Sequence, residues 1–334
     1  MADCDTSYDP LGEILKYVLQ SFFMFFSLIL HLKFIFAIRK MYRKDHRLNS
    51  FYSLYLLECI LNTLSILSLI FLIKPITYIT YLCPILSESF PTPSYLLNFL
   101  WISDYLQIAK FITHAFLSLN RMTCVIFPFK FSIWWGKWLF CSVFFIFLTP
   151  ILVLSGVLVS TTTFVPFLGG LGINYVRISS WARLSILKSI VFTIILITVL
   201  LCSSVTIFCL LKMKKKVKGA DKNLCRTTVI STLEVVGFLS LQLFFVLSPF
   251  QETLDAAYDN WMQIQTFTYD VVLFIDPLVT LRMNKKLRNW VFPSRRLSEP
   301  ISPGYLHTTS RAFVIEIADK TATSDKIFHK RLTQ

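Results

Sequence analysis

Long apolar runs separated by short polar segments follow one another along most of the chain. Each run is about as long as the roughly 20 residues that an α-helix needs to cross a membrane. Because irregular backbone cannot face lipid, each run predicts a transmembrane helix. The seven predicted spans are 15–38, 51–73, 96–126, 138–161, 184–211, 227–250 and 261–281.

Proline and glycine fall mostly between these runs or near their ends, as in KPITYITYLCPILSESFPTPS and FVPFLGGLG. These residues are typical of turns and loops, so they support the boundaries of the predicted helices. We find no internal repeat of order or motif. This weakens a transporter interpretation, since transporters favour matched broken helices in two halves.

The composition agrees with the apolar pattern. Of the 334 residues, 55% are hydrophobic and 16% are charged, whereas soluble proteins have about 25% charged residues. The net charge of +14 raises the alternative of a nucleic-acid-binding protein, which would need a soluble basic face. The position of the charges therefore decides between these classes.

The charges alternate from one side of the predicted spans to the other. The amino-terminal tail carries about −4, whereas the four segments on the opposite side sum to about +20. Cytoplasmic segments carry the excess of Lys and Arg, so the sequence predicts an outer amino terminus and an inner carboxyl terminus. The basic segments would face anionic membrane lipids or an acidic partner. Nucleic acid is disfavoured as a partner.

The sequence thus predicts an all-α membrane protein with a seven-helix bundle. The acidic start of the chain argues against a cleavable signal peptide. The predicted parts are an extracellular tail (1–14), a transmembrane domain (15–281), an amphipathic interfacial helix (282–293) and a largely disordered cytoplasmic tail (294–334).

The third predicted helix carries a polar stripe. At about 100° per residue, five polar side chains share an arc of about 80°, and a sixth widens it to about 120°. Ionisable groups that face lipid are costly, so the stripe is expected to face the bundle interior or a water-filled cavity. The five are Gln107, Lys110, His114, Ser118 and Arg121, and the sixth is Asp104.

The outer half of this stripe lies where a small ligand could enter from outside. We take Asp104, Gln107, Lys110 and His114, with Asp270 of the seventh span, as ligand-binding candidates. Lys110 and His114 suit an acidic ligand, Asp104 and Asp270 suit an amine, and the many Phe residues suit a neutral volatile compound. Alternatively, Asp104 and Lys110 pair with other helices and touch no ligand.

Other buried ionisable residues are predicted within the remaining spans. Glu58 and Asp276 could pair with basic groups, share a cation or form structural hydrogen bonds. The remaining residues of this kind are Lys188, Glu234 and Asp270.

Only two of the eight cysteines, Cys4 and Cys83, are predicted to lie outside, where oxidation is favoured. They either form a disulfide or remain separate thiols. No Cys or His spacing resembles a zinc site, and no Gly-x-Ser-x-Gly, His-Glu-x-x-His or phosphate-binding Gly-rich pattern occurs. We therefore expect no enzymatic activity, metal or cofactor.

The stretch SLNRMTCVIFP ends the third predicted span with an arginine. Arg121 either snorkels at the membrane edge or belongs to a switch. The chain resembles a G-protein-coupled receptor, a family in which an acid, an arginine and an aromatic residue end this helix and a proline follows. Arg121 and Pro128 match, whereas Asn120 replaces the acid and Met122 the aromatic residue. The resemblance implies that Arg121 contacts a G protein when the inner ends of the helices part.

The end of the seventh span, FIDPLVTLRMNKKLRNWVF, is similar to the Asn-Pro-x-x-Tyr ending of the same family. Asp276 stands in place of Asn, Pro277 is retained and Thr280 replaces Tyr. The segment that follows is itself amphipathic, with Leu287 and Trp290 on one side and basic residues for lipid headgroups on the other.

These motifs, the short basic loop before the sixth span and the absence of Cys before the fifth most closely resemble nematode serpentine chemoreceptors of class gamma (Srg). The resemblance implies a receptor in the plasma membrane of a sensory cilium, which binds a small molecule and signals through a heterotrimeric G protein. A ligand-gated channel, a transporter and a lipid-modifying enzyme are the alternatives. We find no loop that resembles a selectivity filter, which argues against a channel.

The carboxyl-terminal tail contains a candidate phosphorylation site. The sequence RRLSEP places Ser298 after the basic residues that some kinases prefer. Phosphorylation would add about −2 charges and weaken the hold of the basic tail on anionic lipid. An unmodified, solvated tail is the alternative.

Overall fold

The protein is mostly helical. The computed structural model describes residues 9–44, 50–89, 94–128, 130–167, 169–176, 184–212, 236–237 and 255–292. The chain divides into two compact units, Met1–Val291 and Phe292–Gln334, and every element below belongs to the first. The helices are α1 (Pro10–Lys44), α2 (Ser50–Ser68), a π-helical turn (Leu69–Ile73), α3 (Lys74–Tyr78), α4 (Leu82–Ser89), a 3-10 helix (Tyr95–Trp101), α5 (Ile102–Ile126), α6 (Phe131–Leu158), α7 (Leu184–Lys212), α9 (Asp255–Met283) and α10 (Lys285–Val291).

Five of the seven predicted spans are confirmed as helices that are long and apolar enough to cross a membrane. The second of them continues from α2 through the π-helical turn to the end of α3. These five spans, among the described residues, are Pro10–Arg43, Ser50–Tyr78, Phe131–Leu158, Ile186–Cys209 and Gln263–Arg282.

The third and sixth predicted spans have different outcomes. The third forms α5, a helix of 25 residues that carries the polar stripe and is not among those five spans. The sixth, 227–250, lies outside the described residues except for 236–237.

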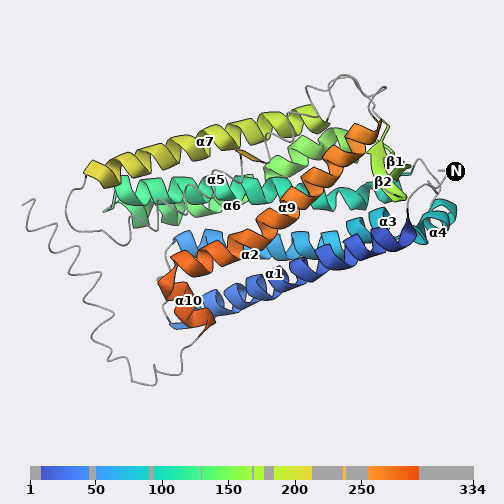
Figure 1. The fold of residues 1–334 in the computed structure, drawn as a ribbon. Coiled ribbons are helices and arrows are strands. Elements are labelled where there is room, and N and C mark those ends of the chain that lie inside the picture. Colours follow the sequence, from blue (N-terminus) through green and yellow to red (C-terminus); the bar gives the residue numbers. More distant parts are fainter. Residues whose placement is uncertain are drawn as a thin grey trace, which may run out of the picture. The chain divides into compact units, whose positions relative to one another are not determined.

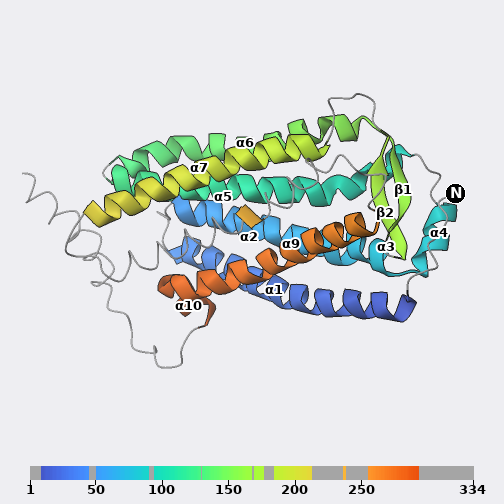
Figure 2. The same ribbon diagram turned by 45° about the horizontal axis from the view of Figure 1, so that its top comes forward.

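Helix α5 lies between the other helices of the bundle. It packs against α2, α6 and α7, while α1 packs against α2 and α9, and the two views in Figures 1 and 2 agree on this arrangement. The core contains fully buried Phe34, Ile108 and Phe111. By contrast, Phe140 and Phe208 are largely exposed, as expected for side chains that would face lipid.

An antiparallel hairpin joins α6 to α7 and corrects the all-α prediction. It consists of β1 (Thr162–Phe167) and β2 (Gly170–Tyr175), with Thr162 opposite Tyr175. Its β-branched and aromatic residues favour a strand. The Pro and Gly residues of FVPFLGGLG had suggested only a loop, but Gly169 has a φ of 77°, a conformation that suits a tight turn.

The hairpin packs on the same end of the bundle as α3 and α4 (Figure 1), which we call the hairpin end. A Cβ atom on Gly170 would lie 2.4 Å from the carbonyl oxygen of Thr77, so only glycine fits this contact. The indole nitrogen of Trp101, just before α5, donates a hydrogen bond to Thr162 Oγ1 at 3.0 Å. The hairpin is therefore fixed to both α3 and the start of α5.

Cys83, in α4 at the hairpin end, is disulfide-bonded. Its partner lies outside the described residues, and so does Cys4, the predicted partner. Among the described cysteines, the free ones are Cys59, Cys124, Cys141, Cys202 and Cys209.

Candidate functional site

Half of the polar stripe of α5 is buried in the bundle. Gln107, Lys110 and His114 are buried, as the helical periodicity predicted, and the other three members are half-buried. The stripe begins with Asp104 near the hairpin end. Its last members lie toward the opposite end of the bundle, where α10 also lies (Figures 1 and 2), and which we call the α10 end. The polar side chains thus follow α5 along nearly its whole length.

Two buried lysines pair with acids near the hairpin end. Lys188 of α7 forms an ion pair with Asp104 of α5, and Lys74 of α3 forms one with Asp270 of α9. Lys74 Nζ also donates a hydrogen bond to Gln20 Oε1 at 2.6 Å. Each pair joins two helices, and the lysine neutralises a carboxylate that would be costly to bury alone.

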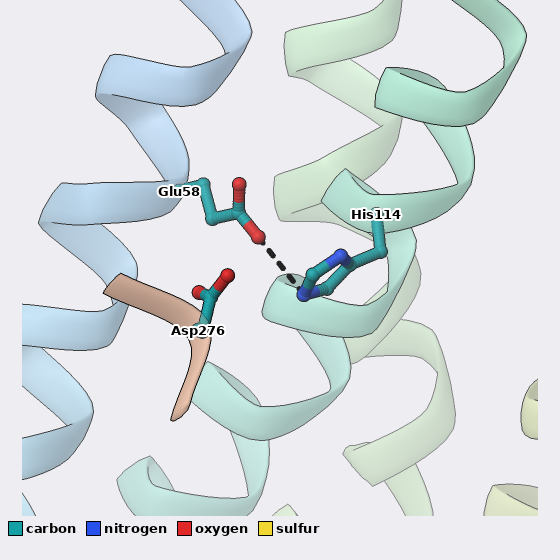
Figure 3. Close-up of side chains that lie close together, drawn as sticks. All are labelled: Glu58, His114 and Asp276. Atoms are coloured by element: carbon teal, nitrogen blue, oxygen red, sulfur yellow. Dashed lines mark ion pairs between the residues drawn. The ribbon is translucent and has the colours of Figure 1, made fainter. Parts of the chain in front are cut away.

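Glu58, His114 and Asp276 meet in the middle of the bundle, and they come from α2, α5 and α9 (Figure 3). His114 Nε2 lies 2.8 Å from Glu58 Oε1. Asn62, one turn along α2 from Glu58, donates a hydrogen bond from Nδ2 to Asp276 Oδ2 at 3.0 Å. Three helices that are far apart in the sequence are therefore joined through one polar cluster.

This cluster has the chemistry of a cation site. The candidate ligand atoms of Glu58, His114 and Asp276 all lie within 4.8 Å of one another, and carboxylate and imidazole groups are common metal ligands. However, the Lys110 ammonium acts electrostatically on both carboxylates. Its positive charge opposes the binding of a further cation.

Lys110 is completely buried one turn from His114. Its Nζ lies 5.7 Å from the centre of the Tyr269 ring, and the Tyr269 hydroxyl donates a 3.3 Å hydrogen bond to Ser65 Oγ. Among the described residues, the Lys110 ammonium has no hydrogen-bond partner.

At the α10 end, α5 is tied to the first turn of α2. Asn120 Nδ2 donates a 2.8 Å hydrogen bond to Ser50 Oγ. The Arg121 guanidinium lies over the Phe51 ring, 5.3 Å from its centre, within the range of a cation–π contact. Pro128 follows the end of α5 and is exposed. The arginine is thus held by an aromatic ring of another helix.

Pro277 lies inside α9, directly after the buried Asp276. A proline within a helix removes one backbone hydrogen bond and favours a kink. Beyond α9, Leu287 of α10 is fully buried and the Lys40 ammonium lies over the Trp290 ring at 5.8 Å. Helix α10 is therefore packed on the end of α1.

A separate, apolar hollow lies between α5, α6 and α7. Its volume is about 270 Å³. None of its described lining residues is charged, and none belongs to the polar stripe. Its lining includes Ile112, Phe116, Phe145, Thr149, Ile195 and Thr198.

The predicted site residues are thus distributed along the whole bundle, and His114 and Asp276, predicted for ligand binding and for the switch, meet in its middle. The sequence missed Lys74, which lies just beyond the predicted second span. The hydropathy pattern offered no signal for it, because a lysine at that position is expected in a loop. Ser298 and Cys4 lie outside the described residues.

Comparisons with known proteins agree with the motifs. A family model described as Srg family chemoreceptor matches residues 17–291. Serpentine receptor class gamma-13 of Caenorhabditis elegans is 33% identical over 303 residues, which cover 90% of this chain and 89% of that receptor. Serpentine receptor class gamma-5 of the same nematode is 30% identical over 296 residues, which cover 88% of this chain and 91% of that receptor.

Proposed function

We propose that this chain, which belongs to the Srg family of chemoreceptors, binds a small molecule through the hairpin end and activates a heterotrimeric G protein at the α10 end. The observation that carries the proposal is the polar stripe of α5, which begins at Asp104 and ends at Arg121. A ligand that binds one arrangement of α5 more tightly than another increases the population of that arrangement. The contacts of α5 then change at both ends of the bundle.

Two independent features support an outer position for the hairpin end. Cys83 of this end is disulfide-bonded, and disulfides form outside the cytosol. The segments on the α10 side carry the excess of Lys and Arg, as is typical of cytoplasmic loops. A disulfide between Cys4 and Cys83 would tie the amino-terminal tail to α4.

The ligand-binding residues of this proposal are Asp104, Gln107, Lys110, His114 and Asp270. All five belong to α5 or α9, and the helices α7 and α3 supply the lysines that pair with the two acids. A ligand inserted among these groups would change how α5 contacts its neighbours.

Arg121, with Asn120, Pro128, Asp276 and Pro277, forms the proposed coupling switch. In this structure Arg121 and Asn120 contact Phe51 and Ser50 of α2. Separation of α2 from α5 would release the guanidinium to bind acceptors of a G protein. Asn120 stands where the family motif has an acid. In this chain the Phe51 ring contacts Arg121 in place of that acid.

The proposal also places the receptor in the plasma membrane of a sensory cilium, with α10 at the inner lipid surface. Arg288 is exposed on α10 while Leu287 is buried, which fits a helix between protein, lipid headgroups and water. Phosphorylation of Ser298 would reduce the attraction of the tail to anionic lipid.

Ligand-evoked signalling in cells expressing wild type, Arg121→Ala or Arg39→Ala tests this function. Acidic, basic and neutral small odorants are screened, and surface display is measured on an amino-terminal tag in intact cells. We expect Arg121→Ala to abolish the response at normal surface display. Arg39→Ala, which removes an exposed arginine of α1 near the same end, should respond normally. A normal response of Arg121→Ala would refute the switch.

A further inference from the structure

Lys110 differs from the other buried lysines in its surroundings. Lys74 and Lys188 each have a carboxylate partner. Lys110 is 0% exposed, and Nζ has no hydrogen-bond acceptor among the described residues. The Tyr269 ring at 5.7 Å offers a cation–π contact, which replaces only part of the hydration that a buried ammonium loses.

Two acids that act electrostatically on Lys110, Glu58 and Asp276, each have another described group at closer range. Glu58 contacts His114 and Asp276 accepts a hydrogen bond from Asn62. Within the described parts of the chain, neither carboxylate forms an ion pair with Lys110, although both act on it at longer range. The three donors of the ammonium therefore remain available to a bound acceptor.

The ion pairs of Lys188 and Lys74 disfavour an amine ligand. Asp104 and Asp270, the acids that suited an amine, are bound to Lys188 and Lys74. An amine would have to displace a buried lysine from its carboxylate, which leaves that lysine unpaired. An acid, by contrast, would supply Lys110 with the acceptor it lacks.

We propose that Lys110 is an anion-binding group and that the receptor's ligand is a small organic acid whose carboxylate accepts hydrogen bonds from its ammonium. This inference rests on the proposed function for the existence of a small-molecule ligand. The ring of Tyr269, whose centre lies 5.7 Å from the Lys110 ammonium, provides an apolar surface for the rest of the acid.

A stability measurement without ligand tests whether Lys110 is unpaired. The purified full-length receptor is compared with Lys110→Met and with Lys188→Met, the same change at a buried lysine that has a partner. We expect the melting temperature to rise in Lys110→Met, because an unsatisfied charge is removed, and to fall in Lys188→Met, because Asp104 is left alone. A fall in both would mean that Lys110 is the counter-ion of Glu58 and Asp276, and would overturn the inference.

Ligand chemistry is tested with hexanoate, decanoate and phenylacetate, each compared with its primary alcohol. We expect at least one acid to raise the melting temperature of wild type and of Lys110→Arg. In Lys110→Met the acid concentration needed should rise about 10- to 100-fold, since one charge-assisted hydrogen bond is lost. No stabilisation by any of these acids, or equal stabilisation by acid and alcohol, would contradict the inference.

Nucleotide exchange on an added G protein separates this inference from the proposed function. If acids stabilise the receptor through Lys110 but never accelerate exchange, the binding site stands and the signalling function fails. If alcohols or amines accelerate exchange equally in wild type and Lys110→Met, the signalling function stands and the inference fails.

Discussion

The buried pair of Lys74 and Asp270 allows a quantitative test of how the helices are held together. The lysine is 1% exposed and the aspartate 9%, so removal of one partner leaves an uncompensated buried charge. Such changes cost about 3–5 kcal/mol. At about 2–4 °C per kcal/mol in chains of roughly 150–250 residues, Lys74→Met should lower the melting temperature by about 10 °C.

The double variant Lys74→Met with Asp270→Leu should recover most of this loss, because both charges are removed together. The assay is thermal unfolding of the purified full-length protein. Lys16→Met is the matched control, because Lys16 is 47% exposed in its pair with Glu13 and such pairs contribute about 0–1 kcal/mol. A shift for Lys74→Met no larger than that for Lys16→Met would show that the pair of Lys74 and Asp270 does not hold the helices together.

Two further changes test other parts of the structure. Gly170→Ala should reduce surface display strongly, because its Cβ would lie 2.4 Å from the Thr77 carbonyl oxygen. Gly136→Ala is the control and should be displayed normally, because a Cβ atom at this position has no neighbour within 4 Å. Equal display of the two variants would contradict the contact between the hairpin and α3. Asn120→Ala should raise ligand-independent signalling by up to about 5-fold, since it removes one hydrogen bond of about 1 kcal/mol to Ser50. Ser50→Ala should have the same effect. Unchanged basal signalling in both variants would show that the hydrogen bond between Asn120 and Ser50 does not hold the receptor in its inactive state.

Hydropathy predicted the long helices of the described residues, because a membrane span needs a long run of apolar residues. It did not predict the short helices α3 and α4, which lie in a segment interpreted as a loop. Helical periodicity also predicted which face of α5 is buried, because residues three and four apart share a face. Both are local properties of the chain. The inward position of Lys110 and His114 could therefore be derived without knowledge of the fold.

The pairing of charges could not be predicted in the same way. Lys74 and Asp270 are separated by 196 positions, and a single sequence gives no signal of which helices face each other. The contact of Arg121 with Phe51 is likewise set by the packing of α5 on α2. The hairpin was missed because its Pro and Gly residues, typical of loops, lie in and between two short strands.

The most direct test of the account is nucleotide exchange on a purified heterotrimeric G protein by the full-length chain reconstituted in lipid vesicles. The same small acids, alcohols and amines are added to wild type and to Arg121→Ala. We expect at least one compound to accelerate exchange by wild type and Arg121→Ala to abolish this effect. A ligand-evoked ion current or uptake across the vesicle membrane, without any exchange, would contradict it and favour a channel or a transporter.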